Sequence, residues 1–384
     1  MKKIKLFTIA VCAAAIIALC GYTVPIASAA QAPEFDVPSV LLADAGTGTV
    51  LFEQNAKEHR PIASMVKIMT LLLVFENAEN GNLSYDEEIT VSENAASMGG
   101  SQAFLDAHAA YLCDDLIKSI VVASVNDSCV ALAERIAGSV DGFVARMNEK
   151  AAQLGMNDSN FVNCTGLPAP NQYSCAYDAA IMFGELIKHE RYFDYADVWM
   201  FDFHHPSGRD TVLTNTNKMI RSYEGCDGGK TGFTNEAMYC LSATAKRGDT
   251  RLIGVITGAD TSKHRNAEMS ELFDFGFANY STKQVIFGGQ ELPERLEVAS
   301  SRERSVGVAP AHDGFYLTER GQEKDVRFIC EYDEISLPLA SGSVVGRIKA
   351  VADGVTVAES DLVTTGDLNK MTYFDIVGEL IKEM

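Results

Sequence analysis

Two short apolar runs around a turn mark the first ordered part of the chain. The stretch SVLLADAGTGTVLFEQN contains these runs, Val40–Asp44 and Thr49–Gln54, joined by a glycine-rich turn. Short apolar runs on either side of such a turn predict two β-strands. An apolar run follows from Ile62 to Glu76 and predicts a buried helix.

Helical and strand patterns are mixed as far as about residue 280. A helix is predicted over 115–123, with acidic residues at its start, and DSCVALAERIAG predicts another that ends at Gly138. The segment AMYCLSATAKRGDTRLIGVITGAD predicts a hairpin that turns at 247–249, and RNAEMSELFDFGFANY predicts a further helix. This mixture is typical of an α+β domain built on an antiparallel sheet, which we place at 36–280.

The pattern changes after about residue 285. Short alternating strands with turn signals predict a small β-sandwich domain over 285–362. The last segment, 366–384, repeats apolar residues at a spacing of three to four, which predicts an amphipathic helix. The apolar positions are Leu368, Met371, Phe374, Val377, Leu380, Ile381 and Met384.

The first 29 residues differ from all of these patterns. Three lysines precede an apolar core, and the segment ends in Ala27-Ser28-Ala29. This arrangement predicts a signal peptide, residues 1–29, that is cut after Ala29. A permanent membrane anchor is the alternative, but the polar stretch after the apolar core favours cleavage. Cys20 is an unsuitable lipoprotein cysteine because the bulky Leu19 precedes it.

Charge and cysteine content exclude several classes of function. Loss of the three signal lysines takes the formal charge from −20 to −23, and such an acidic protein repels nucleic acid. No C-x-x-C or H-E-x-x-H occurs, and the pair His204-His205 favours a loop or core position, so we expect no metal site and no cofactor. Removal of the signal peptide leaves an odd number of cysteines, so at least one of them is unpaired. The remaining cysteines are Cys113, Cys129, Cys164, Cys175, Cys226, Cys240 and Cys330.

Ser64 and Lys67 are the first candidates for chemistry. Residues three apart on a helix lie on nearly the same face, so the lysine amine can hydrogen-bond the serine hydroxyl. Partial desolvation lowers the pKa of a lysine, and the neutral amine can then accept the serine proton. The alternative is a helix N-cap followed by a solvated charge. S-x-x-K is a weak signal alone, although it occurs once in this chain.

Two further motifs follow along the chain. Lys230-Thr231-Gly232 opens a strand pattern, where a lysine and a threonine can hold a carboxylate; a simple turn into the strand is the alternative. Ser124-Val125-Asn126 lies between two predicted helices, where both polar side chains can face one cleft. There the alternative is a C-cap followed by an N-cap, and a rival S-x-N occurs at 92–94.

The order and spacing of the three motifs favour a common site. S-x-x-K, S-x-N and K-T-G follow one another about sixty and then about a hundred residues apart, as in penicillin-binding proteins and class A β-lactamases. Residues 36 to about 362 resemble the low-molecular-weight penicillin-binding proteins, the serine-type D-alanyl-D-alanine carboxypeptidases. The segments PIASMVKIMT, MGGSQAFL, TGLPAPNQYSCAYDAA, CDGGKTGFT and LFDFGF extend the resemblance.

The resemblance implies a role for each motif residue. Ser64 resembles the acylated nucleophile and Lys67 its general base. Ser124 and Asn126 resemble the second motif, which relays protons and holds the substrate amide. The remaining residues implied are the carboxylate-binding Lys230, Thr231 and Gly232, the backbone N–H groups of Ser64 and Phe233 as oxyanion hole, and Arg265 near the site.

The chain also departs from the family pattern. Val125 stands where a smaller residue is usual, and Thr165 stands where some relatives carry a histidine. The tail resembles the family's membrane-surface anchor, yet residues 368–384 carry three acidic residues against two lysines, whereas such anchors are usually basic. Packing of the tail against the β domain is therefore the alternative to peripheral membrane contact through 368–384.

The resemblance implies a function in the cell envelope. The expected enzyme removes the terminal D-alanine from peptidoglycan stem peptides through a serine acyl-enzyme and binds β-lactams covalently. It is expected to be exported, to the outer face of the cytoplasmic membrane or beyond. A class A-like β-lactamase is one alternative, but Glu149 and Glu185 fall in helical patterns rather than in a deacylating loop. A catalytically idle wall-binding relative is the other, and the complete motifs argue against it.

Overall fold

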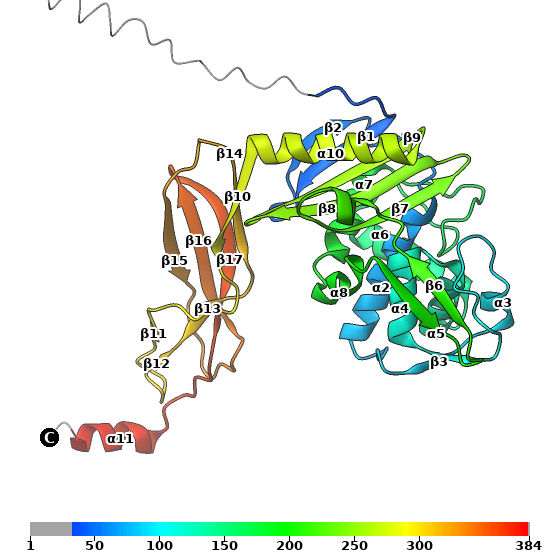
Figure 1. The fold of residues 1–384 in the computed structure, drawn as a ribbon. Helices are drawn as coiled ribbons and strands as arrows, with labels where there is room; N and C mark the ends of the chain where they lie inside the picture. Colours follow the sequence, from blue (N-terminus) through cyan, green and yellow to red (C-terminus); the bar gives the residue numbers. More distant parts are fainter. Residues whose placement is uncertain (1–32, 383–384) are drawn as a thin grey trace, which may run out of the picture. The chain divides into compact units, whose positions relative to one another are not determined.

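The computed structural model describes residues 33–382 and contains an α+β domain followed by a small β domain (Figure 1). This confirms the predicted fold class. The predicted signal peptide, 1–29, lies outside the described residues. Among residues 33–382, no helix is long and apolar enough to cross a membrane.

The α+β domain is built on one antiparallel sheet of five strands in the order β2-β1-β9-β8-β7. The two strands predicted near the start of the chain pair with each other, and the predicted hairpin is formed by β8 and β9. The strand that carries Lys230, β7, lies at the edge of the sheet. The strands are β1 (Ser39–Asp44), β2 (Val50–Gln54), β7 (Cys226–Thr234), β8 (Met238–Arg247) and β9 (Thr250–Ala259).

Both faces of this sheet are buried, and successive residues of β1 point to opposite faces. Val40 and Leu42 pack in the cluster that includes helix α10 (Ser262–Asn279). Leu41 and Ala43 belong to the larger cluster with the other helices. A strand covered on both faces reads as a nearly continuous apolar run, which explains the sequence SVLLAD.

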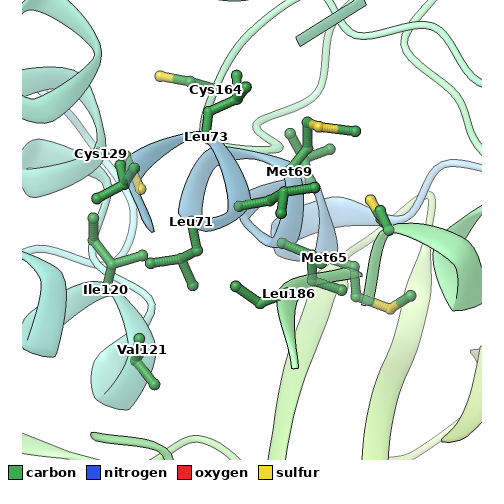
Figure 2. Close-up of a cluster of buried hydrophobic side chains, with 14 of the residues drawn as sticks. Met65, Met69, Leu71, Leu73, Ile120, Val121, Cys129, Cys164 and Leu186 are labelled. Atoms are coloured by element: carbon green, nitrogen blue, oxygen red, sulfur yellow. The ribbon is translucent and has the colours of Figure 1, made fainter. Parts of the chain in front are cut away.

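Helix α2 lies in the middle of the larger cluster (Figure 2). Its residues from Lys67 to Phe75 are all buried, because helices α4, α5 and α7 surround it. Figure 2 shows Leu71 and Leu73 of α2 among Ile120, Cys129 and Cys164. The helices of this domain are η1 (Ala63–Val66), α2 (Lys67–Glu79), α3 (Glu93–Ala96), α4 (Cys113–Ala123), α5 (Asn126–Ala137), α6 (Val140–Gln153), α7 (Ala176–Leu186), η2 (Glu190–Tyr192), α8 (Phe193–Ala196) and α9 (Met219–Ser222).

Two small hairpins accompany the helices. Strands β3 (Glu88–Thr90) and β4 (Ala110–Leu112) form one, and β5 (Met200–His204) and β6 (Asp210–Thr214) form the other. The histidine pair lies at the end of β5. His204 is exposed, whereas His205 is buried and hydrogen-bonds Tyr111 and Thr211, so it is a core histidine as predicted.

The β domain contains a four-stranded antiparallel sheet in the order β13-β17-β16-β15 and two two-stranded sheets. Its apolar core includes Val308, Ile348 and Leu362. The strands are β10 (Tyr280–Ile286), β11 (Leu296–Glu297), β12 (Ser305–Val306), β13 (Val308–Pro310), β14 (Gly314–Glu319), β15 (Val326–Tyr332), β16 (Val344–Ala352) and β17 (Val355–Thr364).

The C-terminal helix is shorter than the apolar spacing predicts. Helix α11 spans Tyr373–Lys382, whereas Leu368 forms an isolated bridge with Leu339 and is fully buried in the β-domain core. Leu368 therefore belongs to the β domain, and its match to the helical spacing is accidental. Met384 lies outside the described residues.

Candidate active site

Ser64 lies in the short 3-10 helix η1, which runs directly into α2 at Lys67. The Lys67 Nζ donates a hydrogen bond to Ser64 Oγ at 3.0 Å and a second to the carbonyl oxygen of Thr165 at 2.5 Å. Lys67 is fully buried, and no side chain caps η1 or α2. The interpretation as an N-cap followed by a solvated charge is therefore wrong.

The backbone around Ser64 is held in an unusual conformation. Ala63, just before the serine, has a φ of 47°, a region that non-glycine residues seldom occupy. Gly166, which follows Thr165, has a φ of +80°, and a Cβ added there would lie 2.0 Å from the carbonyl oxygen of Ala63. Only glycine fits at this contact, so Gly166 lets the loop of Thr165 reach both the serine segment and the lysine amine.

Ser124 connects α4 to α5 and faces the lysine of β7. It is the C-cap of α4 with a φ of 61°, and its Oγ accepts a hydrogen bond from Lys230 Nζ at 2.7 Å. Lys230 Nζ also donates to the carbonyl oxygen of Thr231 at 3.0 Å. The backbone of Ser124 therefore forms a helix C-cap, as the alternative interpretation predicted. Its side chain also makes a buried polar contact with Lys230, 106 positions later in the chain.

Asn126 begins helix α5 beside Ser124. Its side-chain Nδ2 donates to the carbonyl oxygen of Gly99, and its backbone N–H donates to that of Ser101, both at 2.7 Å. Its Oδ1 is buried and accepts no hydrogen bond from the described residues. A buried acceptor of this kind is costly unless a ligand supplies a donor.

The rival S-x-N triplet has a structural role. Ser92 caps helix α3 by accepting from the backbone N–H of Ala95, and Asn94 donates to Glu134. Neither residue joins the Ser64 network through a described hydrogen bond. Glu149 and Glu185, the two glutamates considered for a β-lactamase loop, lie within helices α6 and α7, and Glu185 pairs with Lys188 at 2.6 Å.

Thr216 is a site residue that the motifs did not reveal. Thr231 Oγ1, in the K-T-G strand, donates to Thr216 Oγ1 at 2.8 Å. The neighbouring Asn215 fixes this segment, since its Oδ1 accepts from Asn217 N–H and its Nδ2 donates to the carbonyl oxygen of Ala196. In the sequence, Thr216 is simply a threonine between two asparagines, and this pattern does not indicate a catalytic or binding role unless the fold is known.

Burial controls the charge of the two lysines. It lowers the pKa of Lys67, and the Asp127 carboxylate is among the groups that offset this in part. Burial also lowers the pKa of Lys230 well below its usual range, and the charge of Lys67 lowers it further. Two ammonium groups in one buried pocket disfavour each other, so one of the two amines is readily neutral.

Gly232 and Phe233 complete the strand that faces the serine. A Cβ on Gly232 would lie 2.5 Å from the carbonyl oxygen of Ile62, so glycine lets β7 approach the residues just before Ser64. The Phe233 side chain is half exposed, and its ring centroid lies 4.3 Å from that of Tyr239. The K-T-G residues are therefore part of a strand and not of a turn leading into one.

Arg265 is buried in the first turn of α10, where burial lowers its pKa to about 10. It donates to the carbonyl oxygen of Cys240 at 3.3 Å and to the Asn266 side chain. Its charge is among those that lower the pKa of Lys230. The structure thus brings Arg265 into the neighbourhood of the lysines, but joins it to neither serine by a described hydrogen bond.

One group among the described residues has the composition of a metal site. Asp158, Cys175 and Asp178 place their ligand atoms within 4.8 Å of one another. Hydrogen bonds account for this cluster, because the Asp178 carboxylate accepts from Asp158 N–H and Ser159 Oγ, and Cys175 Sγ accepts from Asp178 N–H. Burial also raises the pKa of the Cys175 thiol to about 12, which disfavours the thiolate that a metal needs. The seven cysteines within residues 33–382 are all free, and of these seven only Cys330 is exposed.

The sequence is similar to those of known proteins over most of its length. Residues 26–261 match the D-alanyl-D-alanine carboxypeptidase family, and residues 280–370 match the C-terminal domain of penicillin-binding protein 5. The chain is 38% identical to D-alanyl-D-alanine carboxypeptidase DacF of Bacillus subtilis over 88% of this chain and 87% of that protein. It is 32% identical to DacA of Escherichia coli over 92% and 88% of the two chains.

Solved structures are similar over the same regions. Penicillin-binding protein 5 from Haemophilus influenzae superimposes with a TM-score of 0.70 at 30% identity, covering 88% of this chain and 99% of that one. Penicillin-binding protein D2 from Listeria monocytogenes, solved in an ampicillin-bound form, covers 64% of this chain and 99% of its own, with a TM-score of 0.55 and 30% identity.

Proposed function

Because the chain belongs to the D-alanyl-D-alanine carboxypeptidase family of low-molecular-weight penicillin-binding proteins, we propose that Ser64 is its acylated nucleophile and Lys67 the general base. The observation that carries this assignment is the 3.0 Å hydrogen bond between Lys67 Nζ and Ser64 Oγ in a site that buries the lysine. A neutral Lys67 amine accepts the serine proton as Ser64 Oγ attacks the carbonyl carbon between the two D-alanines.

The leaving D-alanine needs a proton on its amine. Ser124 can deliver its hydroxyl proton and take a replacement from the Lys230 ammonium group, which donates to Ser124 Oγ, while the proton from Ser64 stays on Lys67 until the acyl-enzyme is hydrolysed. Lys230 donates its own hydrogen to Ser124 Oγ, so the Ser124 hydroxyl hydrogen is free to point elsewhere. Asn126 presents the unpaired Oδ1 described above, which can accept the N–H of the substrate's peptide backbone. Water then hydrolyses the acyl-enzyme and releases the shortened stem peptide.

Lys230 and Thr231 are proposed to bind the terminal carboxylate of the substrate. A bound carboxylate favours the charged form of the nearby Lys230. Since the two buried lysines disfavour each other's charge, a proton held on Lys230 keeps Lys67 neutral and ready to act as a base. The backbone N–H groups of Ser64 and Phe233 are proposed as the oxyanion hole, which the close approach at Gly232 makes geometrically reasonable. Arg265 supplies additional positive charge to this end of the site.

Two assays test the active-site proposal. The purified protein should release D-alanine from a pentapeptide that ends in D-Ala-D-Ala, and a fluorescent penicillin should label it covalently. Ser64→Ala should abolish both activities, a loss of about a million-fold in turnover. Ser92→Ala, which removes only a helix cap, should leave both intact. Full labelling of the Ser64→Ala protein would show that another residue is acylated.

β-Lactams are proposed as covalent inhibitors, with peptidoglycan stem peptides as the natural substrate. The rate at which the penicillin label is lost separates this function from that of a β-lactamase. Slow loss, with a half-life of many minutes, is expected because neither Glu149 nor Glu185 belongs to a loop at the site. Rapid turnover of the label would favour the β-lactamase assignment.

The domain organisation and location are also proposed. We infer a signal peptide over 1–29, a catalytic domain over 36–280, a β domain over 285–362 and a C-terminal helical segment over 366–384. Export past the cytoplasmic membrane follows from the signal peptide and from the substrate, which lies in the cell envelope. N-terminal sequencing of the exported protein should give Ala30 as the first residue.

Peripheral contact with the membrane is proposed through helix α11. Tyr373, Phe374 and Ile381 are 75%, 83% and 68% exposed, so packing against the β domain does not cover them. Sedimentation with liposomes should bring down the mature protein but not a variant that ends at Thr372. Because the segment carries more acidic residues than lysines, its binding should weaken as the anionic lipid content rises. Equal sedimentation of the two proteins at every composition would exclude an anchor.

A further inference from the structure

Strand β15 is an open edge of the β-domain sheet. It pairs with β16 on one side, and among the described residues it has no strand on the other side (Figure 1). Six of its seven residues are exposed. An open, apolar edge strand tends to pair with another chain, and proteins usually protect such edges with charges, prolines or bulges. Here the edge carries the large apolar side chains of Phe328, Ile329 and Tyr332 beside two charged residues, Arg327 and Glu331.

One face of β15 is apolar, whereas the other carries Ile329 between the charged residues Arg327 and Glu331. Phe328 and Tyr332, 54% and 41% exposed, line a groove together with Phe287, which lies after β10 and is 50% exposed. Ile329, on the opposite face of the strand, is 47% exposed. Contiguous exposed apolar groups of this size are typical of interaction surfaces.

Pairing of β15 with β16 leaves backbone N–H and C=O groups at regular intervals along the open edge. The backbone N–H of Asp333 donates to the carbonyl oxygen of Val345, next to the pair Tyr332 and Gly346. In an antiparallel ladder, alternate residues point their N–H and C=O groups to the same neighbour. The odd-numbered residues of β15 therefore bond to β16, and the backbone groups of Phe328 and Cys330 point outward.

The sequence of β15, VRFICEY, is complementary to itself when two copies run antiparallel with Ile329 on the twofold axis. Arg327 then stands opposite Glu331 of the second copy. Within its own chain Glu331 Oε2 accepts from Lys349 Nζ at 2.7 Å, so the carboxylate would be shared between the two cations, and the same contact forms again on the other side of the axis. We propose that β15 is a homodimer interface, in which two copies of this chain pair their edge strands antiparallel about Ile329.

The apolar residues match in the same register. Val326 stands opposite Tyr332, and Phe328 stands opposite Cys330, so no charge faces an apolar group along the strand. Phe328 and Cys330 make the hydrogen-bonded pairs, while Ile329 meets its own copy at the closer, non-hydrogen-bonded spacing. A twofold interface needs one patch that complements itself, and this edge meets that requirement.

The alternative register, with Cys330 on the axis, matches the charges less well. It places Glu331 opposite Ile329 and Arg327 opposite Asp333. A partner protein of another kind would not need the mirrored placement of Arg327 and Glu331. The charge complementarity therefore favours a second copy centred on Ile329.

Site-directed cross-linking tests the register in the mature protein. In the double variant Ile329→Cys/Cys330→Ser, two cysteines meet across the axis with Cα atoms about 4.5 Å apart, within disulfide range. Mild oxidation should give a covalent dimer. The unaltered chain should cross-link far less, because Cys330 and its copy lie diagonally about 7–8 Å apart. Efficient cross-linking of the unaltered chain, with none in the double variant, would overturn the register.

Oligomeric state tests the interface itself. Analytical ultracentrifugation over a range of protein concentrations should show a monomer–dimer equilibrium. Ile329→Lys places two like charges opposite each other at the axis and should raise the dimer Kd at least about tenfold. Val355→Lys, at another exposed position of the same sheet, is the matched control and should leave the Kd unchanged. Since Ile329 is exposed, both variants should fold like the parent.

Two outcomes would overturn the proposal. A protein that stays monomeric at every concentration, including several hundred micromolar, has no such interface. A dimer that survives Ile329→Lys but is lost on deletion of residues after Thr372 would be formed by α11 and not by β15. Release of D-alanine by the Ile329→Lys variant should remain normal in either case, so this test is independent of the proposed active site.

Discussion

Gly166→Ala should separate the nucleophile from its base, although it replaces neither residue. The glycine has a φ of +80°, and a Cβ there would lie 2.0 Å from the carbonyl oxygen of Ala63. Real Cβ contacts essentially never fall below 3.0 Å, so the two segments must separate by about 1 Å. One segment carries Ser64, and the other supplies the Thr165 carbonyl oxygen that holds Lys67.

The structure sets the expected size of the effect. A displacement of 1 Å in a reacting group can cost about 100-fold in rate, so we expect acylation by penicillin to slow by about that factor. Gly155→Ala is the matched control, since Gly155 has a φ of +73° with nothing within 4 Å of the added Cβ. It should incur only the left-handed backbone penalty of about 1–2 kcal/mol and keep normal acylation.

The assay is the second-order rate constant for labelling by fluorescent penicillin, with thermal unfolding measured in parallel. Gly166→Ala should unfold at a lower temperature than Gly155→Ala, because strain at the loop adds to the backbone penalty. If Gly166→Ala is acylated within about threefold of the Gly155→Ala rate, the close contact does not position Ser64 and the argument fails.

The remaining predictions concern the lysines and Thr231. Lys67→Arg should lose nearly all acylation, because arginine keeps its proton at any working pH; near-normal labelling would mean that Lys67 acts only as a cation. Acylation of the unaltered protein should rise with pH through the pKa of Lys67, which burial lowers, and then level off; a rate that falls as the pH rises past neutral would contradict a neutral amine base. Thr231→Val should reduce D-alanine release roughly 10- to 1,000-fold, with a smaller loss on a C-terminally amidated peptide and near-normal rates for Thr231→Ser; equal losses on both peptides would show that Thr231 does not contact the carboxylate.

Local sequence patterns predicted the helices and strands correctly where neighbouring elements bury the whole segment. The apolar run at Val40–Asp44 and the turn at 247–249 predicted strands within a residue or two of their observed ends. The apolar run of α2 gave a buried helix because its neighbours cover it on all sides. The prediction that Leu368 belongs to the C-terminal helix was wrong for the opposite reason. Leu368 is buried because it pairs with Leu339, and the spacing of apolar residues along the chain does not reveal such a distant contact.

The motif residues of the active site could be predicted from the sequence, but the neighbouring residues that hold them in place could not. Three motifs pointed to Ser64, Ser124 and Lys230, and the structure brings them together with Lys67. Thr216 was missed because its importance comes only from a hydrogen bond to Thr231, fifteen residues away. Gly166 lay within a recognised segment, yet the need for glycine arises from contact with Ala63 more than a hundred residues earlier.

The two lysines show why the arrangement matters more than the residues alone. An ordinary lysine is protonated at neutral pH and cannot act as a base. Burial of Lys67 lowers its pKa, and Lys230 in the same pocket makes a second positive charge unfavourable. The proposed contact of the substrate carboxylate with Lys230 would then decide which lysine keeps the proton. On this view the substrate itself readies the base, so a peptide without a free carboxylate should be processed slowly even when it binds.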